Sequence, residues 1–197
     1  MKSYKLFILF ILFITQLVGC APSTIFAIPA SIADRRTVEV QFIDNKIYLA
    51  SWGPIQEITD NEKQKSHFNI AVFNQAVVVV GEVPNEGVKN SITDVRSKIK
   101  NVKTVHNKMV VGEACKIKQR AKDTITTSNV KTRLFLEINN EVHPLHVKIM
   151  TENDIVYILG IVNNKEADEV IKIAKSSKVV KLVVPLFELD EEVKNKY

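Results

Sequence analysis

The sequence has little of what several common protein classes require. Its 197 residues include only two cysteines, which excludes a disulfide-rich scaffold. Charged residues make up 25% and hydrophobic residues 46%, so neither a wholly disordered chain nor a polytopic membrane protein is expected. The net charge of +5 permits an anionic partner without requiring one. This composition indicates a globular protein with one medium domain or two small ones.

Catalytic motifs are also missing. The sequence contains no glycine-rich phosphate loop, nucleophile elbow or metalloprotease motif. His143 and His146, with Glu141 nearby, could suggest a metal site, but Pro144 argues against their presentation on a helix. We interpret them as surface histidines beside a strand, and Asp34-Arg35-Arg36 as a solvated or locally paired turn. We therefore expect no enzyme, no metal site and no cofactor.

The amino terminus has the features of a targeting segment. Lys2 and Lys5 precede an apolar run of 13 residues, 6–18, which is too short for a spanning helix but suits a signal peptide. The tetrapeptide Leu17-Val18-Gly19-Cys20 resembles a bacterial lipobox, in which the cysteine sulfur takes a diacylglycerol. The alternative is a buried cysteine in a hydrophobic helix. We predict a signal peptide over 1–19, lipidation at Cys20 and an extended tether over 20–33.

The second cysteine and the remaining charge point to no further chemistry. If Cys20 carries lipid, Cys115 is a lone thiol with no identifiable base beside it, and we interpret it as an incidental linker cysteine. Removal of residues 1–19 deletes Lys2 and Lys5, which leaves 25 basic and 22 acidic residues. No concentrated basic stripe is present, so no nucleic-acid partner is expected. The absence of an acidic residue directly after Cys20 favours the outer membrane, by resemblance to bacterial lipoproteins.

The rest of the sequence contains an internal repeat. At a constant offset of 79 residues, many positions of the first half match the second. The matched pairs are Ile70 and Ile149, Asn74 and Asn153, Val77 and Val156, Gly81 and Gly160, Asn85 and Asn164, and Ile92 and Ile171. After a one-residue slip, 102–105 matches 180–183.

Each copy predicts the same elements. Two β-rich runs flank a turn at 74–75 or 153–154, where asparagine tolerates positive φ, and Gly81 and Gly160 suggest a bulge or a close backbone approach. Asn163 and Glu166 have the spacing of a capping box. A third strand is predicted near 103–111 and 179–187. A helix with one apolar stripe precedes it in each copy, formed by Val88, Ile92, Val95 and Ile99 in the first and Ala167, Val170, Ile171 and Ala174 in the second.

A further helix is predicted before each hairpin. In the second copy it runs from Asp123 to about Ile138, with Val130 and Leu134 on its core face. In the first copy it begins near Asp44, and Gly53-Pro54 is expected to end it early. The fold class is therefore α+β, with helix–strand–strand–helix–strand occurring twice and a three-stranded sheet packed against two helices in each copy.

A lipoprotein signal followed by two such units resembles the dual BON-domain lipoproteins of the Gram-negative envelope, the DolP (YraP) family. The similar stretches are 34–44, 81–85, 105–107 and 151–160. The resemblance implies two tandem BON domains at 34–113 and 123–190, joined by a linker at 114–122 and followed by a tail at 191–197. It also implies a non-enzymatic protein on the periplasmic face of the outer membrane that supports membrane integrity.

The helix after Asp123 carries the candidate ligand surface. Ile125, Phe135 and Leu136 fall opposite its core face, and Lys131 and Arg133 lie near them, as does Lys122. Apolar residues framed by bases are typical of an interfacial helix on anionic phospholipid. In the resembling family this helix is associated with phospholipid binding, and Ile125 stands where the family commonly has tryptophan.

Two alternatives stay open for this face. The partner domain could cover it, or it could dock an envelope enzyme or assembly factor as a protein adaptor.

Overall fold

The structure is a computed structural model that describes residues 34–60, 65–95, 99–137 and 142–190. Residues 33–197 form one compact unit. The predicted signal peptide 1–19, Cys20, the tether 20–33 and the tail 191–197 lie outside the described residues.

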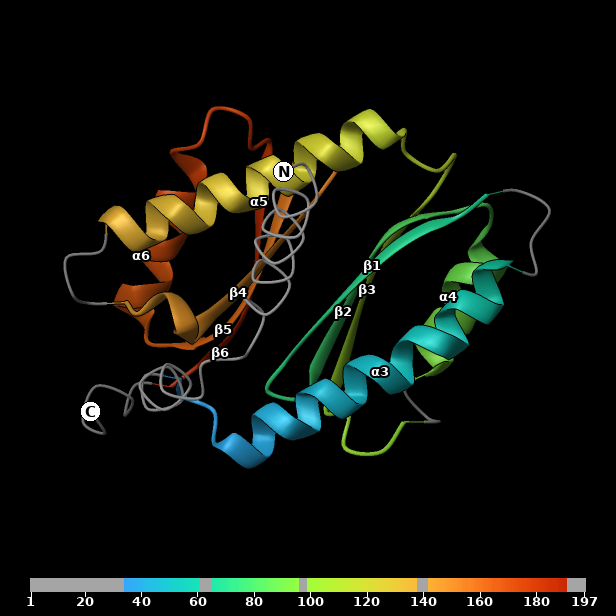
Figure 1. The fold of residues 1–197 in the computed structure, drawn as a ribbon, viewed down its shortest axis with the longest axis horizontal. Coiled ribbons are helices and arrows are strands. Elements are labelled where there is room, and N and C mark those ends of the chain that lie inside the picture. Colours follow the sequence, from blue (N-terminus) through green and yellow to red (C-terminus); the bar gives the residue numbers. More distant parts are fainter. Residues whose placement is uncertain (1–33, 61–64, 96–98, 138–141, 191–197) are drawn as a thin grey trace, which may run out of the picture. The chain divides into compact units, whose positions relative to one another are not determined.

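The described residues contain the predicted order of elements twice (Figure 1). The first repeat consists of α3 (Val38–Asp60), β1 (His67–Phe73), β2 (Ala76–Val83), α4 (Glu86–Asp94) and β3 (Thr104–Val111). The second repeat consists of α5 (Ile117–Glu137), the 3-10 turn η3 (Pro144–His146), β4 (Val147–Glu152), β5 (Ile155–Val162), α6 (Asn164–Lys175) and β6 (Leu182–Leu189). The α+β prediction is confirmed.

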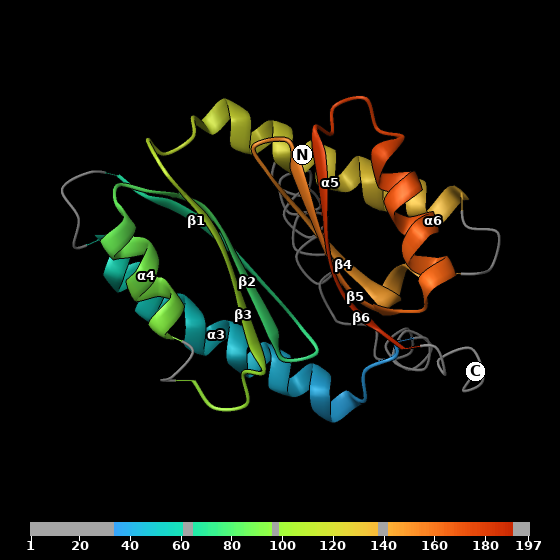
Figure 2. The same cartoon turned by 180° about the vertical axis from the view of Figure 1, so that it is seen from behind.

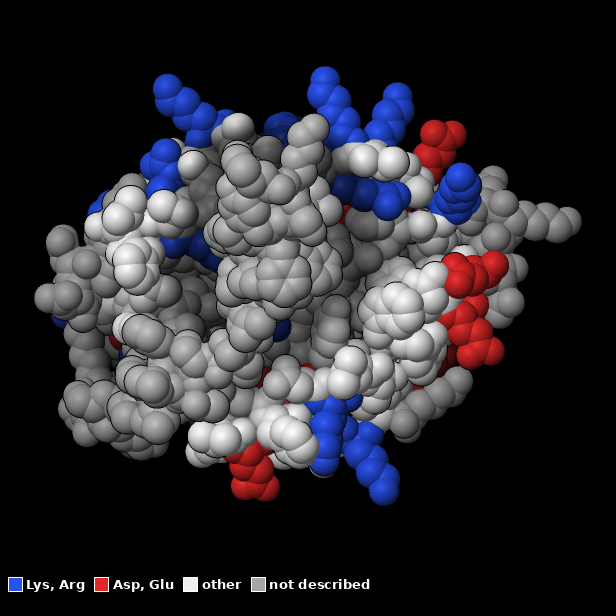
Figure 3. Space-filling view, viewed as in Figure 1, with Lys and Arg blue, Asp and Glu red and all other residues white. Residues whose placement is uncertain are grey.

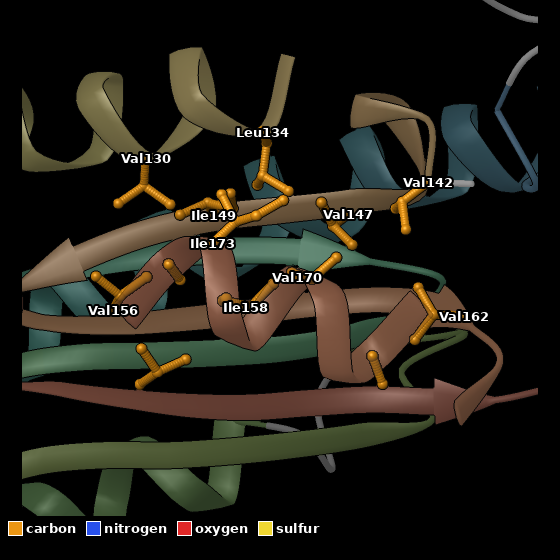
Figure 4. Packing of buried hydrophobic residues seen from close by; sticks show 13 residues of the cluster. Val130, Leu134, Val142, Val147, Ile149, Val156, Ile158, Val162, Val170 and Ile173 are labelled. Atoms are coloured by element: carbon orange, nitrogen blue, oxygen red, sulfur yellow. The ribbon is translucent and has the colours of Figure 1, made fainter. Parts of the chain in front are cut away.

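Both sheets have the same topology. The middle strand, β2 or β5, pairs antiparallel with the strand before it and parallel with the last strand. Within each repeat, two helices cover one face of the sheet, as the view from behind also shows (Figure 2). Figure 4 shows the second core, in which Val130 and Leu134 from α5 and Ile173 from α6 pack on Ile149 and Ile158 of the sheet.

The hairpin and glycine predictions are confirmed. Residues 74–75 and 153–154 all have positive φ, between 49° and 66°, which is the geometry of a two-residue type I′ turn. A Cβ at Gly81 would lie 2.1 Å from the carbonyl oxygen of His67, and one at Gly160 would lie 2.8 Å from that of His146. Glycine is therefore required in the middle strand because the backbone at or just before the start of the first strand passes too close for a side chain.

The register of the repeat changes earlier than predicted. Asn85 caps α4 and Asn163 caps α6, each accepting a backbone N–H with its side chain, so the offset is already 78 at the helix start. Asn164 is therefore not the counterpart of Asn85. Ile92 corresponds in the same way to Val170 rather than to Ile171. Val170 is fully buried, whereas Ile171 only packs against the edge of the core.

Two helix boundaries differ from the predictions. The first helix does not end at Gly53-Pro54 but continues to Asp60. Buried residues on both sides of Pro54, Ser51 and Ile55 among them, anchor the helix to the sheet, so packing outweighs the lost hydrogen bond. In the second repeat, α5 begins at Ile117 rather than Asp123, and residues 117–122, which we assigned to a linker, are helical.

The two repeats share an apolar interface. The sheet faces that carry no helix meet through a cluster of Ala71, Phe73, Val78, Val80, Tyr157, Leu159 and Ile161.

The Asp34-Arg35-Arg36 turn lies beside this interface. Arg36 pairs with Asp34 at 2.6 Å, as expected for a locally paired turn. Arg35 is not solvated, however. Its side chain is 6% exposed and forms a bidentate ion pair with Glu166, with both N–O distances at 2.7 Å. The turn before α3 is thereby joined to the first turn of α6, which no sequence pattern indicated.

A candidate membrane-binding helix

The outward face of α5 exposes large apolar side chains. Ile117, Ile125, Phe135 and Leu136 are 81%, 69%, 72% and 74% exposed, respectively. On the opposite side, Val130 and Leu134 are buried in the core, so the helix has apolar residues on both faces. The partner domain does not cover Ile125, Phe135 or Leu136, which removes one of the two alternatives considered from the sequence.

Basic side chains frame this apolar face. Lys131 is exposed, and Arg133 is half-buried because its guanidinium donates to Asn129 Oδ1 at 2.9 Å and to Ser176 Oγ at 3.2 Å. Lys122 is held by a 2.8 Å ion pair with Asp154. Figure 3 shows Lys and Arg side chains projecting along the edge of the molecule that α5 occupies.

The predicted residues do not all gather in one place. Ile125 and Arg133 line a hollow of about 980 Å³ between α5 and the loop 176–179. Phe135, Leu136 and Lys131 do not line it. The candidate residues of α5 are therefore divided between this hollow and the exposed outer surface of the helix.

The first repeat shows that the fold does not need apolar residues at the positions of Ile125, Phe135 and Leu136. Asp44 and Asp123, at an offset of 79, bind equivalent hairpin turns, so α3 and α5 can be compared at that offset. The equivalents of Ile125, Phe135 and Leu136 in α3 are the polar residues Lys46, Gln56 and Glu57.

The two helices also differ in charge. The α3 sequence has one basic and four acidic residues, whereas α5 has five basic and two acidic residues. The side chains of α3 therefore carry a net charge of −3 (1 − 4), and those of α5 a net charge of +3 (5 − 2).

Helix α3 has an exposed apolar stripe of its own, which our sequence reasoning missed. Val38, Phe42, Leu49 and Trp52 are between 49% and 72% exposed. They recur at i, i+4, i+11 and i+14, which is the spacing of one helix face. This periodicity was missed because the helix was predicted to begin near Asp44, after Val38 and Phe42.

The other sequence candidates have structural explanations. The His143 and His146 side chains form a capping box around η3, in which each Nδ1 accepts a backbone N–H. Burial raises the pKa of Cys115 to about 11, although the neighbouring Arg120 opposes the shift. The protonated thiol is a poor nucleophile at neutral pH.

Comparisons with known proteins agree with this architecture. The family model described as "BON domain" matches residues 55–113 and 122–191. The chain belongs to the BON domain family. BON domain 1 corresponds to the first repeat and BON domain 2 to the second.

Two proteins of similar sequence align with much of the chain. "Outer membrane lipoprotein DolP" of Haemophilus influenzae is 29% identical over 172 residues, which are 86% of this chain and 88% of that protein. "21 kDa hemolysin" of Actinobacillus pleuropneumoniae is 26% identical over 125 residues, which are 61% of this chain and 63% of that protein. The chain is thus a dual BON-domain protein of the DolP type.

A solved structure of CdsD, described as a structural protein of the type III secretion system of Chlamydia trachomatis, also matches. It covers 73% of this chain with 13% identity and a TM-score of 0.29.

Proposed function

We propose that this protein is a non-enzymatic outer-membrane lipoprotein, anchored through Cys20 and facing the periplasm, whose BON domain 2 contacts anionic phospholipid and thereby supports outer-membrane integrity. The similarity to a protein named as an outer membrane lipoprotein supports the location. The observation that supports lipid contact is the exposure of Ile125, Phe135 and Leu136 beside basic residues, at three positions that are polar in α3.

Physical chemistry favours an interfacial rather than a spanning mode. In the described part of the chain, no helix is long and apolar enough to cross a membrane. A helix that lies in the interface places its apolar face at the acyl boundary and its bases near the phosphates. Phe135 and Leu136 supply the first element, and Lys131 supplies the second. Burial of one Phe side chain contributes about 1.5–3 kcal/mol.

The hollow beside Arg133 is the binding site that we propose for a headgroup phosphate. Arg133, Ile125 and residues 176–179 all line this hollow. Arginine binds phosphate through parallel hydrogen bonds. Binding there would exchange the contact between Arg133 and Ser176 for contacts with phosphate oxygens.

Co-sedimentation with vesicles tests the proposal. The protein used is residues 33–197, which form a compact unit and lack the acylated cysteine. It should bind phosphatidylglycerol vesicles and bind phosphatidylcholine vesicles less well. Phe135→Glu should lower affinity for phosphatidylglycerol by about ten- to a hundredfold. Lys131→Glu should weaken binding less, and mainly at low salt, because an exposed charge is screened.

Leu49→Glu on α3 is the matched control, because Leu49 and Phe135 are equally exposed, at 72% each. It should leave vesicle binding unchanged. If Leu49→Glu and Phe135→Glu weaken binding equally, a general loss of apolar surface explains the effect and α5 is not the lipid site.

An adaptor that docks an envelope protein is the alternative function. The exposed stripe on the acidic helix α3 favours it, since that helix does not suit anionic lipid. Failure of wild-type residues 33–197 to bind vesicles would make the adaptor the better hypothesis, with α5 and α3 as its docking faces.

A further inference from the structure

Three side chains from different parts of the fold converge beside the interface between the BON domains. His67 begins β1, Cys115 lies between the domains, and Glu152 ends β4. One possible ligand atom from each lies within 4.8 Å of the others. Positions 67, 115 and 152 are too far apart in sequence for any spacing motif to reveal them.

The distances match those of a metal's coordination sphere. His67 Nε2 lies 3.6 Å from Glu152 Oε1, and Cys115 Sγ lies 3.5 Å from the same oxygen. Tetrahedral Zn²⁺ has bonds of about 2.0–2.1 Å to nitrogen, 2.0–2.2 Å to oxygen and 2.3 Å to sulfur, which separates neighbouring donors by roughly 3.3–3.6 Å. Two of the three donor separations therefore already match a zinc site, and the third, between His67 and Cys115, is no more than 4.8 Å.

Neighbouring groups hold the donors in place. Glu82 accepts the backbone N–H of Cys115 at 3.0 Å and also the side-chain amide of Asn153. Asn69 donates to the second oxygen of Glu152 at 2.7 Å. Such outer contacts orient ligands in known metal sites.

The charge of the cluster also suits a cation. Glu82 and Glu152 are 5% and 4% exposed, and their carboxylates repel each other. The guanidinium of Arg120 lies nearby, where it donates to the carbonyl oxygen of Cys115. Two carboxylates and one guanidinium leave an excess of negative charge, which a divalent cation would compensate.

We propose that His67, Cys115 and Glu152 form a Zn²⁺ site that fastens BON domain 1, the connecting segment and BON domain 2 together. A nitrogen, a sulfur and a carboxylate oxygen are the ligand set of a borderline-soft metal. The thiol loses its proton to solvent when the metal binds. His67 and Cys115 line a hollow of about 1030 Å³, so the fourth position opens to solvent and takes a water or an external ligand. Zn²⁺ binding does not require the lipid contact of α5.

Co²⁺ and Zn²⁺ titrations of residues 33–197 test this site. Cys115 is the single cysteine of that part of the chain, so a sulfur-to-Co²⁺ charge-transfer band can arise from it alone. Calorimetry should show one Zn²⁺ per chain, and Zn²⁺ should raise the melting temperature.

Cys115→Ser should abolish the charge-transfer band. His67→Gln and Glu152→Gln should each weaken Zn²⁺ binding by about tenfold or more, which is at least the effect of losing an outer-shell contact. His106→Gln, a histidine of β3 outside the cluster, is the matched control and should bind as wild type.

Two results would overturn the site. One is a wild-type protein that binds Co²⁺ without the sulfur band. The other is Zn²⁺ affinity that all three variants retain. Circular dichroism of each variant shows whether weaker binding reflects the loss of a ligand or the loss of the fold. The Co²⁺ spectrum of the wild-type protein tests the site even if a variant does not fold.

Discussion

Asp44 and Asp123 hold the same turn in the two halves of the chain. Each carboxylate comes from the helix before a hairpin and accepts both backbone N–H groups of the two turn residues. The distances are 2.7–2.8 Å for Asp44 at turn 74–75 and 2.9 Å for Asp123 at turn 153–154. Both aspartates are 3% exposed. The relationship fixes where each helix crosses its hairpin.

Asp44→Asn and Asp123→Asn should therefore each lower the free energy of unfolding. An amide has one acceptor oxygen and cannot accept both N–H groups as the carboxylate does, and hydrogen bonds to charged groups are worth about 1.5–3 kcal/mol. Denaturant melts measure the loss. Asp168→Asn, at an exposed position of α6, should change stability by less than about 0.5 kcal/mol. Equal effects at all three sites would contradict the role of the turn contacts.

The corrected repeat register makes a second prediction. Ile92→Ala should lower stability by about 2–5 kcal/mol, because Ile92 is 1% exposed in the first core. Ile171→Ala should cost clearly less, since Ile171 only borders the second core. Urea melts of the two variants decide the register, and an equal loss at both positions would restore the offset of 79 through α6.

The Arg35–Glu166 pair predicts a dependence of stability on pH. Burial opposes ionisation of Glu166, but hydrogen bonds from Arg35 and the Asn163 backbone outweigh it and lower the pKa of that carboxyl. Because this pKa is lower in the folded state, the ionised carboxyl stabilises the fold at pH values above its unfolded-state pKa of about 4.3. That stabilisation is lost as the pH falls through the lower folded-state pKa. Arg35→Met leaves a buried carboxylate unpaired and should cost about 3–5 kcal/mol at pH 7.

Glu166→Gln is the matched comparison for this pair. Glutamine can keep the capping box with Asn163 while it removes the charge. Melting temperatures measured from pH 6 to pH 3 should therefore fall less steeply in Glu166→Gln than in wild type. Parallel curves would mean that Glu166 does not contribute to acid sensitivity.

The anchor makes a prediction about residues outside the described structure. Cys20 carries the sulfur of the lipobox-like tetrapeptide, so Cys20→Ser with the signal retained should leave the protein without lipid. Metabolic labelling with a fatty acid measures this directly. Label that persists on the Cys20→Ser protein would disprove the assignment of that cysteine.

Much of the fold could be predicted because its determinants are local or repeated. The positive φ of Asn74 and Asn153, the close approach at Gly81 and the cap at Asn163 each follow from one residue type at one position. The offset of 79 then carries the local predictions for the hairpins and glycines from one half to the other, and it fails from the start of the second helix, where the offset becomes 78.

The errors arise where tertiary packing decides. Pro54 lies inside a helix because buried residues on either side hold the chain against the sheet, and no local pattern reveals that anchoring. The contact of Arg35 with Glu166 and the convergence of His67, Cys115 and Glu152 depend on how the two domains pack. The exposure of Phe135 was predicted from helical periodicity, since its angle on α5 is a local property.

The measurement that tests lipid contact most directly exchanges the α5 residues for those of α3. Phe135→Gln/Leu136→Glu gives BON domain 2 the pair that BON domain 1 carries at the equivalent positions, Gln56 and Glu57. Because these positions are exposed and the first domain folds with the polar pair, the circular dichroism spectrum and melting temperature should stay near wild type. The dissociation constant for phosphatidylglycerol vesicles should rise about a hundredfold or more. A folded double variant that binds these vesicles as wild type does would contradict the assignment of α5 as the membrane-binding helix.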